Sequence, residues 1–222
     1  TKGLSYDEVK QAISDARPGD TVSLPEGEAM WNKPMVIDKG IKIVGAGAGK
    51  TVIYSGFSAP DRSNVFDTGD YLVVFRPSNP SSSDVFRLSG MTLDLKGKSY
   101  GILLQNKTVT AISQLRIDNN VIKDPAGNGN GILIHIYGTL YGVVDNNELV
   151  NGSIRCNGLD TMTWNNWDFD FGTAENMYFE DNRFKAPDAM YFYGEMGGRY
   201  CARYNTFDGT GSDNGLYPFS DM

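Results

Sequence analysis

The chain has 222 residues, of which 20 are basic and 27 acidic, and a formal net charge of −7. This length fits a single domain, and an acidic chain without a basic stripe argues against a nucleic-acid partner. No apolar run reaches the roughly 18 residues of a membrane-spanning helix, so we expect no membrane span. The 26 glycines, 12 tyrosines and 11 phenylalanines favour short strands and tight turns.

The first 20 residues carry the signature of a short amphipathic helix. Ser5 and Glu8 form a capping-box pattern. Apolar residues follow at helical spacing: Val9, Ala12, Ile13 and Ala16. The pattern breaks at residues 17–20, and a strand is expected at 21–24. Because the end of a stacked sheet is open to other strands, we predict that residues 1–20 form an N-terminal helical cap and lead-in.

Residues 21–85 are predicted to form the first coils and a polar loop. Short β-rich runs at 35–37, 41–44 and 51–54 are separated by glycine-bearing turns. The glycine-rich stretch at 45–51 has Val44 where a phosphate-binding loop needs its first glycine, so we interpret it as a bend. Residues 55–85 contain the most polar stretch and are expected to leave the coil as a surface loop.

A six-residue phrase then recurs five times across residues 86–222. It has an apolar residue, two mostly polar residues, a fourth residue that is Asn in four copies, a variable residue and a second apolar residue. Variable spacing between such short units is typical of a solenoid. Asn suits a corner between strands because it tolerates left-handed backbone conformations and bonds nearby backbone. We predict a structural ladder of stacked side chains at Asn120, Asn147, Asn182 and Asn205.

Three features together resemble a known superfamily: residues 12–27 (AISDARPGDTVSLPEG), residues 37–45 (IDKGIKIVG) and the Asn-corner repeats. They are similar to the right-handed parallel β-helix proteins of the pectin lyase-like superfamily. The resemblance implies one all-β domain over residues 1–222, a right-handed parallel β-helix (solenoid) with a short N-terminal capping α-helix. It also implies an extracellular or cell- or virion-surface setting and a carbohydrate ligand. It supplies no catalytic motif, because the superfamily includes lyases, glycoside hydrolases, esterases, tailspikes and adhesins.

The two cysteines are too few for a disulfide framework. Alternation points Cys156 inward, whereas the repeat register points Tyr200 and Ala202 inward and Cys201 outward. We therefore expect the two thiols to be unbonded. The chain stops soon after the last repeat, so we expect an exposed C-terminal end on a chain that is either a fragment of a longer coil or stacks on something else.

The strands that precede the Asn corners predict a surface patch on one sheet. Aligning residues 101–105, 131–135, 153–157 and 189–193 by alternation sends two files of side chains outward. The first file consists of Leu103, Leu133, Arg155 and Tyr191. The second consists of Gln105, His135, Asn157 and Tyr193, and Glu195 and Tyr137 extend the patch. Aromatic faces, amides and an arginine suit a sugar that carries a carboxylate.

This patch contains the groups that β-elimination from a uronic acid requires. Arg155 would neutralise the carboxylate, His135 or a tyrosine would remove the C5 proton, and Tyr193 would protonate the leaving oxygen. We predict these three as catalytic. The predicted substrate-binding residues are Gln105, Asn157, Tyr191, Glu195, Trp164 and Trp167. A histidine on an exposed strand also occurs without any catalytic role, so an interpretation as a binding patch stays open.

Residues 164–171 (WNNWDFDF) form a second candidate region. Alternation places Trp167, Phe169 and Phe171 on one side, with Asp168 and Asp170 on the other. One interpretation is a loop wall with aromatic stacking and two carboxylates for calcium, the one candidate cofactor. The other, which the pattern favours, is a core-facing strand with its acidic side in water.

We thus predict a secreted or surface carbohydrate-active β-helix protein that binds a polysaccharide or oligosaccharide. If it is an enzyme, uronate β-elimination is favoured over hydrolysis, which makes it a polysaccharide lyase ahead of a glycoside hydrolase. The alternative is a non-catalytic glycan-binding adhesin, a phage tailspike segment or a structural solenoid. The substrate and the oligomeric state stay open.

Overall fold

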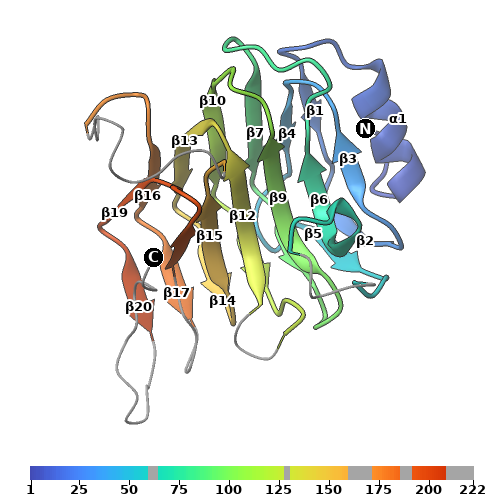
Figure 1. The fold of residues 1–222 in the computed structure, drawn as a ribbon. Coiled ribbons are helices and arrows are strands. Elements are labelled where there is room, and N and C mark those ends of the chain that lie inside the picture. Colours follow the sequence, from blue (N-terminus) through green and yellow to red (C-terminus); the bar gives the residue numbers. More distant parts are fainter. Residues whose placement is uncertain (60–64, 128–130, 160–171, 186–191, 209–222) are drawn as a thin grey trace.

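The computed structural model describes residues 1–59, 65–127, 131–159, 172–185 and 192–208. Its strands form three sheets in which paired strands run parallel, and each turn of the chain contributes one strand to each sheet (Figure 1). The fold class predicted from the sequence, a right-handed parallel β-helix with an N-terminal helix, is confirmed. Among the described residues, no helix has the length and apolar character that a membrane crossing requires.

The three sheets share one rule, since every third strand along the chain returns to the same sheet. The first sheet consists of β1 (Thr21–Ser23), β4 (Lys42–Val44), β7 (Val85–Ser89), β10 (Ile112–Asp118), β13 (Leu140–Asp145), β16 (Met177–Glu180) and β19 (Tyr200–Arg203). The second sheet consists of β2 (Gly27–Trp31), β5 (Thr51–Ser55), β8 (Thr92–Asp94), β11 (Val121–Lys123), β14 (Glu148–Val150), β17 (Arg183–Lys185) and β20 (Thr206–Asp208). The third sheet consists of β3 (Met35–Ile37), β6 (Tyr71–Phe75), β9 (Tyr100–Asn106), β12 (Ile132–Gly138), β15 (Ser153–Asn157) and β18 (Phe192–Glu195).

Helix α1 (Tyr6–Asp15) packs against β2 and β3 at the N-terminal end of the stack (Figure 1). Its predicted capping box is present, because Glu8 N donates to Ser5 Oγ at 3.4 Å and Ser5 N donates to Glu8 Oε2 at 3.3 Å. Val9 and Ile13 are buried in the main core. The helix therefore covers apolar surface that the first coil would otherwise expose to water.

Two strands lie where the sequence predicted turn or loop. β2 begins at Gly27, two residues after Pro25 and close behind the strand expected at 21–24, and β6 lies inside the expected loop at 55–85. All five residues of β6 are buried, and the strand pairs with β3 and β9. The loop prediction is therefore wrong at 71–75, where a short apolar run completes a coil. The 3₁₀ turn Thr68–Asp70 leads directly into this strand.

The first sheet confirms the predicted register of the repeats. Ile117 pairs with Val144, Val144 with Phe179, and Phe179 with Ala202. These side chains contribute to one continuous core, and burying an aliphatic side chain of this size stabilises the fold by about 1.5–3 kcal/mol. Both cysteines are free: Cys156 is buried, and Cys201 is partly exposed, as expected.

The Asn ladder is present, although the left-handed residue is not the one expected. Each of the four corners that contain a ladder Asn has two residues, and the one before the Asn has the positive φ. These residues are Asn119 (φ 55°), Asn146 (φ 54°), Asp181 (φ 52°) and Tyr204 (φ 59°). The left-handed residue turns the chain, which leaves the ladder amide free to point into the coil.

The ladder bonds repeat from coil to coil. Asn147 Oδ1 accepts from Asn120 N at 3.0 Å and from Asn120 Nδ2 at 3.1 Å, while Asn147 Nδ2 donates to Ile117 O at 2.8 Å. Asn182 and Asn205 bond the coils before them in the same way. Each amide thus satisfies backbone groups at the previous corner that would otherwise be buried without a partner.

Candidate functional site

The outward face of the third sheet brings the three predicted catalytic residues into one row. Leu103 on β9 pairs with His135 on β12, His135 pairs with Arg155 on β15, and Arg155 pairs with Tyr193 on β18. The sequence had placed His135 and Tyr193 in the neighbouring file. The observed register on β12 and β18 differs by two residues, which keeps a side chain on its face but gives it a different neighbour.

A bulge on β12 shows that the prediction of an outward-facing Leu133 is wrong. The register shifts between Ile132 and Ile134, so Leu133 joins the main core instead of facing outward. Ile132 belongs to a separate small cluster with Tyr71, Leu103 and other apolar residues. The extra residue of a bulge changes which side of the sheet its neighbours face, and no alternation pattern reveals where a bulge falls.

The second outward row on the same face contains polar groups. Gln105 pairs with Tyr137, Tyr137 with Asn157, and Asn157 with Glu195. Gln105 and Asn157 are each only 1% exposed. The prediction that these two amides contact substrate is therefore not supported, because a ligand on this face meets the side chains above them.

His135 is fully buried, so the expectation that it faces solvent is wrong. Its Nδ1 lies 2.8 Å from the Tyr71 hydroxyl and 3.1 Å from Val65 O, and the Phe66 ring lies 5.5 Å away. Val65 and Phe66 come from the insertion before β6. These two residues lie over the row, and their position cannot be read from local sequence.

Burial also decides the charge of this imidazole. Loss of hydration, with a smaller contribution from the Arg155 charge, lowers the pKa of His135 to about 4, although its bonds to Asn157 and Val65 favour the charged form. His135 is therefore neutral at pH 7. A neutral and covered imidazole cannot reach the C5 proton of a bound sugar.

Arg155 and Tyr193 are only partly buried and form the open part of the row. The Arg155 guanidinium carbon lies 4.5 Å from the centre of the Tyr193 ring, a cation–π contact. No carboxylate in the described part of the chain forms an ion pair with Arg155, and its Nε is buried without a hydrogen-bond partner there. An arginine held against a ring, without an ion pair to any described carboxylate, is suited to bind an anion.

Glu195 holds the Tyr193 hydroxyl, which donates a hydrogen bond to Glu195 Oε1. This hydrogen bond, followed by burial and by the Glu195 charge, raises the pKa of Tyr193 above its ordinary value. Asn157 Nδ2 donates to Glu195 Oε2 at 3.4 Å. Tyr193 therefore keeps its proton at neutral pH, which suits a hydrogen-bond donor and not a base.

Several predicted residues lie outside the described residues: Tyr191, Trp164, Trp167, Asp168 and Asp170. Over the residues that are described, no group of three or more His, Cys, Asp or Glu side chains is placed to hold a metal ion. The calcium prediction concerns only the undescribed segment.

Three neighbours of the row were missed from the sequence. Tyr71 bonds His135, the Phe66 ring lies 4.7 Å from that of Tyr137, and Lys107 Nζ lies 5.8 Å from the Tyr137 ring. Phe66 and Tyr71 fell within the predicted loop at 55–85. The apolar run YLVVF at 71–75 was the signal that could have identified Tyr71 as part of a strand.

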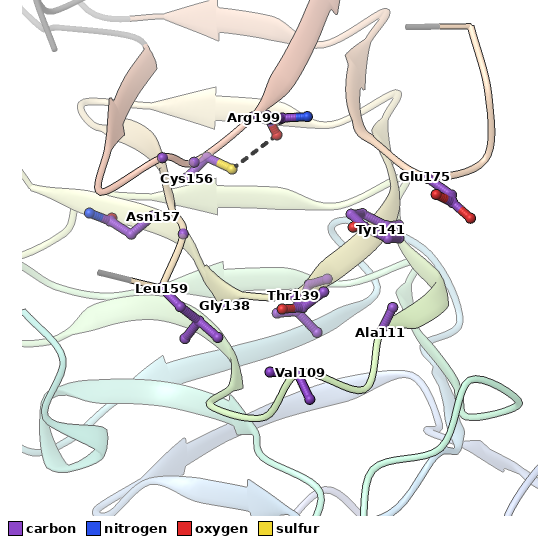
Figure 2. Close-up of a pocket in the computed structure, with 14 residues that line it drawn as sticks. Val109, Ala111, Gly138, Thr139, Tyr141, Cys156, Asn157, Leu159, Glu175 and Arg199 are labelled. Atoms are coloured by element: carbon purple, nitrogen blue, oxygen red, sulfur yellow. Dashed lines mark hydrogen bonds between the residues drawn. The ribbon is translucent and has the colours of Figure 1, made fainter. Parts of the chain in front are cut away.

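A separate hollow of about 440 Å³ lies around the corner, where the third sheet leads into the first (Figure 2). Thr139, Tyr141, Asn157 and Arg199 line it, together with Cys156, whose Sγ donates to Arg199 O at 3.4 Å. Burial raises the pKa of Cys156 to about 12. The thiol is therefore protonated and does not act as a nucleophile.

No family model matches the chain, and neither does any curated protein sequence. Among solved structures, ORF18 of Geobacillus virus E2 is 14% identical, over 84% of this chain and 43% of the viral chain, with a TM-score of 0.45. The pectin methylesterase from Aspergillus niger is 9% identical, over 98% of this chain and 86% of that enzyme, with a TM-score of 0.43. A pectin methylesterase in complex with a hexasaccharide is 10% identical, over 94% and 76%, with a TM-score of 0.41.

The chain thus spans less than half of the viral protein that it matches. Identities of 9–14% carry no information about activity. The function therefore has to be argued from the site.

Proposed function

We propose that this protein binds an acidic polysaccharide on the outward face of its third sheet, and that Arg155 is the contact for a uronate carboxylate. One observation carries the proposal: a partly exposed guanidinium is held over the Tyr193 ring and has no ion pair with a described carboxylate. Arginine presents a planar fork of donors that matches a carboxylate. Two half-buried tyrosines in the same patch, Tyr137 and Tyr193, provide apolar faces for sugar rings.

The net charge of the chain makes this binding depend on the salt concentration. A net charge of −7 repels a polyanion over long distances, whereas Arg155 attracts a carboxylate at close range. Salt screens both effects, with a screening length of about 8 Å at physiological ionic strength. The setting that fits such a ligand is outside the cell, or on a cell or virion surface.

Binding without cleavage is the function that this geometry supports best. Elimination requires a base near C5, but His135 is covered and neutral, and Tyr193 keeps its proton. Arg155 and Tyr193 still fit the two other predicted roles, to neutralise the carboxylate and to protonate the leaving oxygen. The described part of this face therefore lacks its predicted base.

Binding to polygalacturonate and to alginate tests the proposal, with neutral dextran as the ligand control. We expect the parent to bind the acidic polymers, and Arg155→Ala to weaken that binding about tenfold or more, since losing a charged hydrogen bond costs about 1.5–3 kcal/mol. Arg17→Ala, which removes an exposed arginine near α1, is the matched control and should bind like the parent.

Two results would overturn the proposal: no binding of any acidic glycan by the parent, or equal binding by Arg155→Ala and the parent. The same incubations should be followed for unsaturated products and for new reducing ends. We expect neither. Unsaturated products that disappear in Arg155→Ala would instead support the predicted lyase.

A further inference from the structure

A chain of hydrogen bonds leads from Tyr71 on β6 to Tyr193 in the proposed binding row. Tyr71 bonds His135, and His135 Nε2 lies 2.8 Å from Asn157 Oδ1. Asn157 Nδ2 donates to Glu195, which in turn accepts from the Tyr193 hydroxyl. The chain crosses four strands, β6, β12, β15 and β18, and its inner members are fully buried or nearly so.

We infer that His135 is a positioning residue: its buried imidazole fixes the Asn157 amide so that Glu195 holds Tyr193, and it anchors the Val65–Phe66 cover at the same time. This inference rests on the proposed function, because the held groups are those assigned to glycan binding. In this inference His135 orients the residues that bind the glycan and does not act as the predicted base.

The orientation of the Asn157 amide follows from the charges at its two ends. The Glu195 carboxylate accepts hydrogen bonds, so the NH₂ group of Asn157 must face it and the carbonyl Oδ1 must face His135. An oxygen opposite His135 Nε2 requires a proton on that nitrogen. We therefore infer that the neutral imidazole carries its proton on Nε2. The Tyr71 hydroxyl, which donates to Val65 O at 2.7 Å and lies 2.8 Å from Nδ1, then shares its one proton between these two acceptors.

The opposite tautomer would leave one of two unfavourable contacts at Asn157, each closer to a full charge or shorter than the 3.1 Å contact between Nδ1 and Val65 O. A bare Nε2 would face Asn157 Oδ1 at 2.8 Å, or a flipped amide would turn its oxygen toward the Glu195 carboxylate. The titratable and charged groups around the imidazole are Tyr71 on β6, Tyr137 on its own strand, Arg155 on β15 and, through Asn157, Glu195 on β18. Of these, Glu195 is the group that sets the tautomer, because it is the one that orients Asn157.

The chain contains a single histidine, so the imidazole nitrogens can be assigned in a magnetic resonance spectrum of histidine-labelled protein without ambiguity. We expect a protonated Nε2 and a bare Nδ1 at pH 7. Glu195→Gln removes the charge that orients Asn157, and both ring-nitrogen signals should shift. Glu26→Gln, an exposed carboxylate far from the row, is the matched control and should leave them unchanged. A proton on Nδ1 in the parent, or unchanged signals in Glu195→Gln, would overturn the inference.

Glycan binding gives a second, independent measurement. His135→Phe keeps a ring but removes both nitrogens, and we expect polygalacturonate affinity to fall about three- to fivefold, no more than the loss of the Tyr193 ring itself. His135→Gln retains an N–H for Asn157 and should recover most of that loss. A folded His135→Phe protein that binds within about twofold of the parent would contradict the inference.

The two measurements separate this inference from the proposed function. If the parent binds no acidic glycan, the proposed function fails, while the spectra still decide whether Glu195 controls the imidazole. If His135→Phe does not fold, the Glu195→Gln spectra decide alone.

Discussion

The Asn corner and the outward face of the third sheet are both stacks of side chains on the same coil, yet the sequence reveals them to different degrees. At the corner, exactly two residues separate β10 from β11 and β13 from β14, so Asn120 and Asn147 occupy equivalent places. On the third sheet, segments of variable length lead into each strand. A repeat is readable where the chain length between its parts is constant.

The two stacks also differ in what buries them. Asn120, Asn147 and Asn182 are buried by their own coils and bonded by the ladder amide of the next coil. His135 is buried by Val65 and Phe66, which lie 70 and 69 residues earlier in the chain. Local pattern therefore predicts burial at the corner and fails to predict it on the face.

Interrupting the ladder should have the largest effect on stability. Asn147→Ala removes the acceptor for Asn120 N, one of the two acceptors for Asn120 Nδ2, and a donor to Ile117 O, all of them buried groups. We expect a loss of about 3–5 kcal/mol in the free energy of unfolding, since each unsatisfied buried group costs about 1–3 kcal/mol. Urea denaturation of the variant and the parent measures it.

Asn205→Ala provides the matched comparison within the same ladder. Asn205 is partly exposed, so water can replace some of its bonds, and we expect a smaller loss of about 1–2 kcal/mol. Equal losses at the two positions would show that burial does not set the contribution of a ladder amide.

Acid should lower the free energy of unfolding by protonating His135. Its folded-state pKa of about 4 lies below the unfolded value of about 6.5, so the unfolded state takes up a proton first as the pH falls. The stabilisation is fully present above pH about 6.5 and is lost between there and about 4, amounting to about 3 kcal/mol.

The measurement is the free energy of unfolding between pH about 6.5 and 5, above the range where most carboxylates titrate. The parent should lose stability as the pH falls, whereas His135→Gln should show a flatter dependence. A parent and variant with parallel curves would contradict a buried neutral imidazole.

The smallest expected effect is the loss of polygalacturonate affinity when the Tyr193 ring is removed. Tyr193→Ala removes the ring under Arg155 and should lower polygalacturonate affinity about two- to fivefold, because an exposed cation–π contact is worth about 0.5–1 kcal/mol. Tyr193→Phe keeps the ring but loses the hydroxyl that Glu195 holds, so we expect a loss no larger than that of His135→Phe. An effect of Tyr193→Phe as large as that of Tyr193→Ala would assign the contribution to the hydroxyl and not to the ring.

The sequence by itself determined the coil. The capping box at Ser5, the phrase with Asn at its fourth position and the facing of Cys156 and Ala202 all follow from short-range rules, and each is present in the structure. Period-two alternation also placed Arg155 and Tyr193 on one face, because a register error of two residues leaves facing unchanged.

Only the tertiary structure decided the site. It placed His135 beside Arg155, moved Leu133 into the core through a bulge, and covered His135 with residues from a distant insertion. The physical reason is that register between parallel strands depends on the length and course of the segments that join them, and burial depends on every segment that crosses above. The repeat specifies where the chain turns, whereas the chemistry of the face depends on which insertion folds back over it.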